Sequence, residues 1–416
     1  MSARSVLVLG AGFQGRAAAY DLDRSPLVDR VIVADRILAP VEAFLGRVGA
    51  RKVEVLPLDA ADEAALERAI ADPSVALVLD LLPVVFDSSV ARLAVKAAKP
   101  LVTTNYAADL VPLDAEARAA GVTLMPEAGF DPGIDLVMAA HTLRCFDRVE
   151  GVSWYGTGIP APELRGANVI DYKVSWSFAG VLRSYAREAR FRAGGVDRVV
   201  APSEIFSPEW RHEVSVDGIG RLEAFPNGDA VGVAEAYGKL GSVAEIARFT
   251  LRWPGHSEFW RRVAGLGLLD DRTSPEVGVS PREFLRRHLE PQLQYGETER
   301  DLAYLRLDIV GVADGRRMGR RLELIDYRDL KTGLLAMSRL VGYPASVVSQ
   351  MILRGEITKT GVARAAADIP SERFFDELEA RAVRFTEAEV DPDECFVPSR
   401  LPGCRTAPCG PRLSPG

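Results

Sequence analysis

A glycine-rich turn near the start of the chain constrains its fold more than any other feature. Residues 5–9 read SVLVL, a short apolar run that ends at Gly10. Such a run is typical of a strand that is buried on both faces of a parallel sheet. Residues 16–25, RAAAYDLDRS, follow the turn and have the composition of a helix. A strand, a glycine turn and a helix in this order predict the first half of a βαβ unit.

The turn itself reads GAGFQG, a complete G-x-G-x-x-G motif. Gly10 permits a tight turn, Gly12 lets the backbone come close to a pyrophosphate, and Gly15 allows the helix to pack against the strand. Phe13 and Gln14 start the helix, where backbone N–H groups without intrahelical partners can bind an anion. We therefore expect these five residues to bind a dinucleotide. A glycine turn without a ligand is the alternative.

Charged residues after the next two apolar runs bear on which dinucleotide is bound. Asp35 lies 20 positions after Gly15, at the end of the second predicted strand. An acidic residue there accepts hydrogen bonds from the adenosine ribose, and its carboxylate repels a 2′-phosphate, which favours NAD. Arg36 can instead pair with that phosphate, so NADP is possible. Asp59 follows the third apolar run, and we expect it to bind the nucleotide together with Asp35 and Arg36.

The chain keeps alternating between apolar runs and helical stretches up to about residue 128. The apolar runs VALVLDLLP and PLVTTNY alternate with the helical stretches DEAALERAIAD and SSVARLAVKAAK. This alternation predicts an α/β fold with a Rossmann-type, doubly wound parallel sheet over residues 1–128. Asn105 and Tyr106 follow one of the apolar runs. Because ligands gather at the carboxyl ends of parallel strands, we expect both to bind the substrate.

After residue 128 the apolar runs become longer, more polar and more alternating, which is typical of half-exposed strands. They are GVSWYGTG, DYKVSWSF, DLAYLRLDIVGVADG and RRLELIDY, and the turn between the last two predicts a hairpin. We therefore expect a second, mixed-sheet α+β domain over residues 129–332, with a helical insertion at about 254–298. The end of the chain, 390–416, is rich in Pro and Gly and is predicted to be disordered.

Composition argues against several other classes of protein. The 416 residues include 51 Lys plus Arg and 58 Asp plus Glu, a formal net charge of −7, so we expect no nucleic-acid partner. No apolar run reaches the ~18 residues that span a bilayer. The four cysteines do not form a disulfide framework, and neither they nor the four scattered histidines have the spacing of a metal site. We expect a cytoplasmic protein without metal or membrane contact.

Seven motifs in order resemble the signatures of one enzyme family. They are GAGFQG, TTNY at 103–106, EAGFDPGID at 127–135, YGTGIPAPE at 155–163, DYKVSWSFAGVL at 171–182, AFPNGD at 224–229 and VGYPASVV at 341–348. To about residue 375 the chain resembles saccharopine dehydrogenases, or saccharopine reductases, and their lysine 6-dehydrogenase-like relatives. The resemblance implies an NAD(P)-dependent oxidoreductase of lysine and amino-acid metabolism that acts on the C–N bond of an amino acid. It also implies that residues 333–376 complete the dinucleotide domain, and that the second domain closes over the substrate and forms a homodimer.

The resemblance also assigns roles to single residues. Asp131, which precedes Pro132 in a turn entering a helix, is expected to act in catalysis and, with Pro132, to contact the nicotinamide; a plain helix cap is the alternative for Asp131. Lys173 is expected to bind a carboxylate or to exchange protons with the amine, unless it is an ordinary exposed strand lysine. Asn227 and Asp229 are expected to bind the amino and carboxyl groups of the substrate, although ordinary turn chemistry explains the Asn227-Gly228 pair equally well.

The sequence departs from the family pattern in three places. Gly228 stands where saccharopine reductases have an arginine, and Leu136 stands where they usually have a histidine. An arginine expected soon after GVL is not at the matching spacing, but Arg183 and Arg187 flank it, and Arg183 is our candidate for binding a carboxylate. Saccharopine carries three carboxylates, so a lost guanidinium favours a smaller or different N-substituted amino acid. Lysine 6-dehydrogenase activity and a non-catalytic dinucleotide-binding protein are the alternatives.

Overall fold

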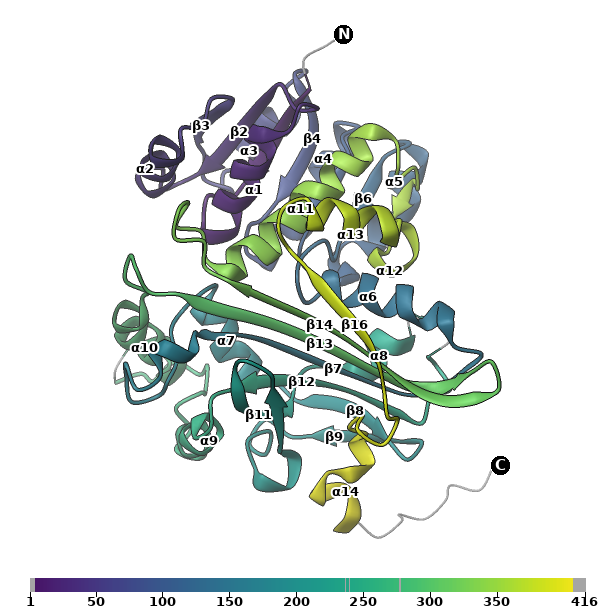
Figure 1. Cartoon of the computed structure of the whole chain (residues 1–416). Helices are drawn as coiled ribbons and strands as arrows, with labels where there is room; N and C mark the ends of the chain where they lie inside the picture. The colour runs from purple at the N-terminus through teal and green to yellow at the C-terminus, as the bar shows by residue number, and fades with distance from the viewer. Residues whose placement is uncertain (1–3, 236, 239, 277, 407–416) are drawn as a thin grey trace. The chain divides into compact units, whose positions relative to one another are not determined.

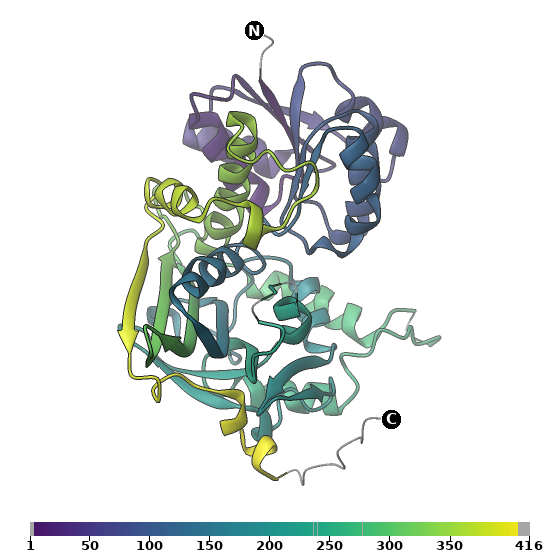
Figure 2. The same ribbon diagram turned by 90° about the vertical axis from the view of Figure 1, so that its right-hand side faces the viewer.

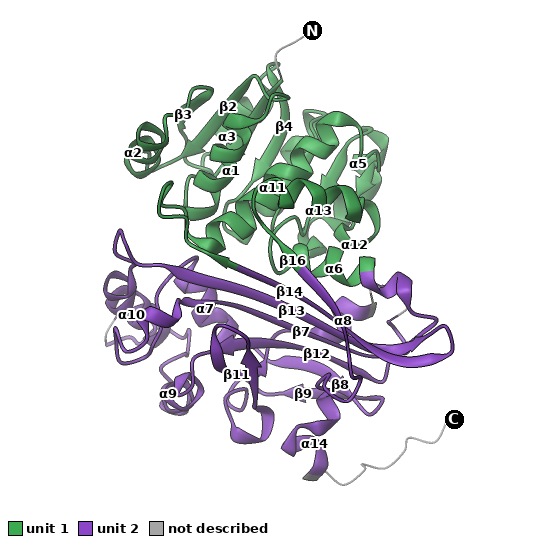
Figure 3. Cartoon of the chain, in the orientation of Figure 1, with its two compact units in different colours: residues 1–141, 326–385 green, residues 142–325, 386–416 purple. Residues whose placement is uncertain are grey.

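In the computed structural model, which describes residues 4–235, 237–238, 240–276 and 278–406, the chain forms two compact units (Figure 3). Unit 1 runs from the N-terminus to His141 and takes up the chain again over Asp326–Phe385. Unit 2 consists of Thr142–Ile325 and the chain from Thr386 onward. A segment from late in the chain therefore belongs to the first unit.

Unit 1 is built on a seven-stranded sheet with the strand order β15-β6-β5-β4-β1-β2-β3. Every strand pair in it is parallel. The predicted Rossmann-type, doubly wound sheet is therefore confirmed. The strands are β1 (Ser5–Leu9), β2 (Arg30–Asp35), β3 (Val53–Pro57), β4 (Val75–Asp80), β5 (Leu101–Thr103), β6 (Thr123–Met125) and β15 (Gly361–Val362).

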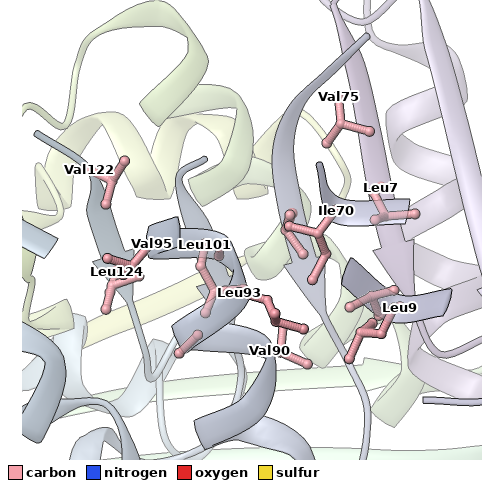
Figure 4. Close-up of a cluster of buried hydrophobic side chains, with 14 of the residues drawn as sticks. Leu7, Leu9, Ile70, Val75, Val90, Leu93, Val95, Leu101, Val122 and Leu124 are labelled. Carbon is pink, nitrogen blue, oxygen red and sulfur yellow. The ribbon is translucent and has the colours of Figure 1, made fainter. Parts of the chain in front are cut away.

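Helices cover both faces of this sheet (Figures 1 and 2). They are α1 (Phe13–Arg24), α2 (Ala39–Val48), α3 (Glu63–Ile70), α4 (Asp87–Lys96), α5 (Asp114–Ala119), α6 (Ile134–Thr142), α11 (Ala336–Arg354), α12 (Ala365–Asp368) and α13 (Ser371–Glu379). Leu7 and Leu9 of β1 point to one face, where they join a buried cluster with Ile70 of α3 and Val90 of α4 (Figure 4). Because side chains alternate along a strand, the other residues of β1 are buried on the opposite face.

Helix α11 brings the late segment of the chain onto the nucleotide-binding half of the unit. It lies beside α1, and a Cβ on its Gly342 would sit 2.6 Å from the backbone oxygen of Gln14 and 2.7 Å from Cβ of Ala17. Only glycine allows two helices to approach this closely at that point. The run of alanines in α1 serves the same contact, since Ala17 and Ala18 are fully buried.

Unit 2 is built on a second sheet with the order β10-β11-β12-β7-β13-β14-β16, to which β8 and β9 are added through β12. β7 pairs in parallel with β12 and antiparallel with β13, so the predicted mixed sheet is confirmed. Its strands are β7 (Arg148–Pro160), β8 (Ala189–Ala193), β9 (Val196–Val200), β10 (His212–Val216), β11 (Gly220–Pro226), β12 (Glu245–Arg252), β13 (Asp301–Ala313), β14 (Arg316–Tyr327) and β16 (Phe385–Val390). Its helices are α7 (Phe178–Tyr185), α8 (Ala230–Glu235), α9 (His256–Gly265), α10 (Pro281–Leu289) and α14 (Pro402–Thr406).

The predicted hairpin joins β13 and β14 through Asp314 and Gly315. Both residues have positive φ, 50° and 73°, as the tight two-residue turns of hairpins require. The expected half-exposed pattern holds for β14, whereas β13 is buried along almost all of its length. Two of the expected helices, α9 and α10, lie within the segment interpreted as a helical insertion.

Two sequence-based expectations in this unit are wrong. Residues 171–177 form no strand, because Ser177 caps α7 by accepting a hydrogen bond from the N–H of Gly180. The expected disorder is contradicted over residues 390–406. The segment follows β16, which lies beside β14 (Figure 2); within it, Cys395 and Leu401 are buried, and the Ser399 N–H donates to Glu245. Pro398 and Pro402 begin short helical elements instead of preventing structure. Residues 407–416 lie outside the described part of the chain.

Candidate functional site

The glycine turn after β1 has the geometry that a dinucleotide requires. A Cβ on Gly10, whose φ is 96°, would lie 2.8 Å from the Leu81 carbonyl oxygen, and a Cβ on Gly15 would lie 1.9 Å from the Gly10 oxygen. The fold itself therefore demands these two glycines. A Cβ on Gly12 would meet no atom within 4 Å, and this residue is exposed at the start of α1, where no side chain caps the helix. The open space and the uncapped N–H groups of the first turn, to which Phe13 and Gln14 belong, fit a pyrophosphate.

Asp35 joins the end of β2 to this turn. Its Oδ2 accepts a hydrogen bond from the Ala11 N–H at 2.7 Å, and its Oδ1 accepts one from the Ile37 N–H at 3.0 Å. The carboxylate therefore holds the glycine turn in place. Each carboxylate oxygen has a further lone pair, so binding of a ribose hydroxyl is still possible.

Arg36 and Asp59 lie together beside it. Their side chains are 69% and 49% exposed, and the guanidinium Nη1 is 3.9 Å from the carboxylate Oδ2. An ion pair this long and this exposed contributes little stability. Arg36 is consequently available to a phosphate group.

A polar cluster that the sequence analysis missed lies at the ends of β4 and β5. Asp80 and Asp87 are fully buried; Asp80 accepts from the Leu82 N–H at 3.0 Å and Asp87 accepts from the Asn105 side-chain amide at 2.9 Å. Burial raises the pKa of Asp80 to about 7 and that of Asp87 to about 6. Tyr106, the neighbour of Asn105, is 40% exposed. An acidic residue closing the apolar run VALVLD was the signal that could have found Asp80.

Asp131 lies in a turn that closes between Gly129 and Gly133, just before α6. It is half-buried, and the Pro132 that follows it is buried. A Cβ on Gly133 would lie 2.0 Å from the Gly129 oxygen, which explains the glycines on either side of the Asp-Pro pair. Because α6 begins at Ile134, Asp131 stands three positions before the first helical residue. This geometry does not fit a plain helix cap.

Lys173 lies in the extended segment before α7 in unit 2. Its Nζ donates to Glu299 Oε2 at 2.7 Å and to the Gln294 carbonyl oxygen at 2.9 Å, and it lies 5.8 Å from the centre of the Tyr295 ring. With 11% of its side chain exposed, Lys173 is not an ordinary surface lysine. An ammonium has three N–H donors, and the described residues accept two of them, which leaves one for another ligand.

The turn after β11 explains how the chain compensates for the missing arginine at Gly228. A Cβ on Gly228, whose φ is 64°, would lie 3.1 Å from Nη2 of Arg187. The same Nη2 donates to Asn227 Oδ1 at 2.8 Å. The guanidinium of Arg187, one of the two arginines that flank the GVL segment, therefore occupies the space over Gly228.

Arg183 and Asp229 have different surroundings. Arg183 is exposed on α7, and within the described ranges its side chain makes no hydrogen bond or ion pair. Asp229 Oδ1 accepts from the Gly232 N–H at 2.8 Å and so caps the start of α8, while Oδ2 lies 3.7 Å from Arg190 Nη1. The local role of Asp229 is thus to cap helix α8.

Other kinds of site find no support in the described residues. No group of three or more His, Cys, Asp or Glu side chains there could hold a metal ion. No helix in the same part of the chain is long and apolar enough to cross a membrane. The thiols of Cys145, Cys395 and Cys404 are free, and Cys409 lies outside the described residues.

Family models match both parts of the sequence. Residues 6–125 match the saccharopine dehydrogenase NADP binding domain, and residues 129–383 match the saccharopine dehydrogenase C-terminal domain. The chain belongs to the saccharopine dehydrogenase family. The family suggested by the seven motifs is therefore confirmed, and with it the prediction of an oxidoreductase that uses a nicotinamide nucleotide.

Curated relatives and a solved structure agree with this assignment. The chain is 27% identical to the NADP(+), L-glutamate-forming saccharopine dehydrogenase of Schizosaccharomyces pombe, over 93% of this chain and 99% of that protein. It is 26% identical to the mitochondrial alpha-aminoadipic semialdehyde synthase of Mus musculus, over 86% of this chain and 45% of that protein. The apo saccharopine dehydrogenase (L-Glu forming) of Saccharomyces cerevisiae superposes with a TM-score of 0.80 at 25% identity, over 93% of this chain and all of that one.

Proposed function

We propose that this protein oxidises the secondary amine of saccharopine, or of a closely related N-substituted amino acid, with NADP(+) as the hydride acceptor, or catalyses the reverse reaction in lysine metabolism. The observation that carries the proposal is the similarity to NADP(+), L-glutamate-forming saccharopine dehydrogenases along nearly the whole length of both chains. The glycine turn with open space over Gly12 supports nucleotide binding independently of that similarity.

The preference for NADP over NAD is supported by the surroundings of Asp35 and Arg36, and it reverses our sequence-based inclination to NAD. Both oxygens of Asp35 accept backbone N–H donors, whereas the Arg36 guanidinium is exposed beside it. A guanidinium pairs well with a phosphate. The matched nucleotide domain and the relatives' names also specify NADP.

In the proposed reaction the nucleotide, when bound, takes a hydride from the carbon of the substrate's C–N bond. The amine nitrogen loses its proton, and an imine forms between that carbon and nitrogen. Water adds to the imine carbon, and the C–N bond then breaks to give an amine and a carbonyl compound. We assign to Asp131 the contact with the reacting amine and its proton. We assign to Lys173 a charge-assisted hydrogen bond to the substrate through its third N–H.

Substrate carboxylates are assigned to the turn after β11. Arg187 presents its guanidinium over Gly228 and is held there by Asn227. We infer that it replaces the arginine that saccharopine reductases have at the position of Gly228. We keep three further residues near this turn as candidates for contacts with the amine and the carboxylates of the substrate, namely Asn227, Asp229 and Arg183. Because the Arg187 guanidinium is present at this position, a substrate with several carboxylates, such as saccharopine, is again favoured.

The decisive experiment is an assay of the purified protein with saccharopine and either NADP(+) or NAD(+), in which the reduced nucleotide and glutamate are both measured. We expect both products, with a higher kcat/KM for NADP(+). Reduced nucleotide and ammonia from free lysine would support lysine 6-dehydrogenase instead. Tight nucleotide binding with no turnover of any amine would support a non-catalytic protein, and either result would reject the proposal.

We further propose a cytoplasmic homodimer. The three free thiols are consistent with a reducing compartment, and dimerisation rests on the family resemblance alone. Sedimentation velocity of the purified chain tests the dimer directly.

A further inference from the structure

The loop after β4 lies at the point of unit 1 where a doubly wound sheet binds its ligands. The strand order reverses between β1 and β4, because β1 leads to β2 on one side while β4 continues to β5 on the other. Loops that follow the two strands at such a reversal flank the ligand crevice. The Leu81 carbonyl oxygen on this loop lies against the glycine turn, 2.8 Å from the position of a Gly10 Cβ.

Two buried carboxyl groups hold this loop and its neighbour. Asp80 Oδ1 accepts the Leu82 N–H at 3.0 Å, and Asp87 Oδ1 accepts the Asn105 Nδ2 at 2.9 Å. Asn105 Nδ2 also donates to the Leu82 carbonyl oxygen at 3.4 Å. The second oxygen of each carboxyl is buried without a hydrogen-bond partner among the described residues. Burying such groups is unfavourable, so their presence calls for a role beyond packing.

These contacts determine which way the Asn105 amide points. A side-chain amide has two N–H donors on one end and one acceptor oxygen on the other. Both hydrogen bonds of the side-chain amide, to Asp87 and Leu82, use its nitrogen. Because an ionised carboxylate can only accept, Asp87 disfavours the flipped amide, in which two oxygens would face each other. The Asn105 Oδ1 forms no hydrogen bond within the described ranges, so it can still accept one from a ligand.

We propose that Asp87 is a positioning residue, which fixes the amide of Asn105 so that Asn105 offers its oxygen to the amine of the amino-acid substrate. This inference rests on the proposed function. A cationic amine suits the position, because the group behind the amide, Asp87, is a buried carboxylate and not a lysine or arginine. A ribose hydroxyl is also a donor, but it is uncharged and gains less from this carboxylate.

The test uses Asp87→Asn, which keeps the shape of the side chain but lets residue 87 donate to Asn105 Oδ1. We expect a KM for saccharopine about tenfold higher, equivalent to about 1.4 kcal/mol of binding, with kcat and the Kd of NADPH changed less than twofold. Asn105→Ala should raise KM similarly, and adding Asp87→Asn to it should have no further effect, since the two residues act through one contact. Asp109→Asn removes an exposed neighbouring carboxylate and is the matched control; it should leave KM unchanged.

Three results would overturn the inference. They are an unchanged KM in Asp87→Asn, fully additive effects in the double variant, or an equal weakening of NADPH binding, which would assign the Asn105 oxygen to the ribose. Failure of the proposed function is a separate result, namely no turnover of saccharopine by the unaltered protein. In that case, calorimetric titration of saccharopine into the protein–NADPH complex gives a Kd for each variant, and these Kd values are compared in place of KM. Absence of saccharopine binding to the unaltered protein would reject the inference as well.

Discussion

The three glycines of the turn after β1 should respond differently to the same substitution. At Gly12 the backbone is extended, with φ −65° and ψ −161°, and an added Cβ meets nothing within 4 Å, so Gly12→Ala should fold normally. Its stability should change by less than about 1 kcal/mol, because the loss of a glycine cap and the reduced freedom of the unfolded chain nearly cancel. The new methyl group enters the space that we assign to the pyrophosphate.

The expected loss of nucleotide affinity follows from crowding of the contact between residue 12 and the pyrophosphate. Forcing a methyl group into a close-packed contact costs about 1–3 kcal/mol. A loss of about 2 kcal/mol raises the Kd of the nucleotide about thirtyfold. At a nucleotide concentration about 100 times the original Kd, ligand stabilisation should then fall from about 2.7 to about 0.9 kcal/mol. Thermal melting with and without NADPH measures this difference.

Gly15→Ala is the matched control for the position of the methyl group. Its Cβ would lie 1.9 Å from the Gly10 carbonyl oxygen, so this variant should lose stability even without nucleotide. The reasoning would be refuted if Gly12→Ala bound NADPH as tightly as the unaltered protein. It would also be refuted if Gly12→Ala without nucleotide melted at as low a temperature as Gly15→Ala.

Three further predictions concern charged side chains. Arg36→Ala should weaken NADPH binding about tenfold and NADH binding less than twofold, because an exposed guanidinium next to Asp35 serves only the 2′-phosphate. Fluorescence titration measures both affinities, and an equal loss of affinity for the two nucleotides would contradict this role. Arg187→Met should raise the KM for saccharopine at least tenfold with little change in melting temperature, since Arg187 is exposed and, among the described residues, hydrogen-bonds only to Asn227. An unchanged KM would remove it from the site. Burial raises the pKa of Asp80 to about 7. The folded protein therefore keeps a proton on Asp80 that the unfolded chain loses above about pH 4. The free energy of unfolding should consequently fall as pH rises from about 4 to 7. Asp80→Asn should make this fall shallower in urea unfolding at several pH values; an unchanged slope would show that Asp80 is ionised when folded.

Features that depend on local sequence were predictable in this chain. The β1 run SVLVL is buried throughout, and its glycine turn leads into α1 as the motif indicated. The hairpin turn at Asp314 and Gly315 was equally clear, because so few residue pairs adopt positive φ together. In these cases the residues that signal the element also determine its backbone.

Features that depend on distant partners were not predictable. Alternation around Lys173 suggested a strand, but Glu299, more than 120 positions later, holds its side chain, and a cap at Ser177 starts a helix instead. The space over Gly228 is filled by Arg187 from a different element, and no spacing in the sequence reveals that. The pairing of Asp87 with Asn105 likewise arises only when β4 and β5 are adjacent.

The contact between α1 and α11 has a consequence for the order in which the chain acquires structure during synthesis. Ala17 and Ala18 face a partner that is translated more than 300 residues later, at Gly342. Until the ribosome has passed α11, the helix that carries the phosphate-binding turn has no cover on that side. The glycine turn and α1 are therefore translated first, but they are among the last parts of the chain to complete their packing. A chain truncated before residue 336 would lack α11 and leave apolar surface of α1 exposed.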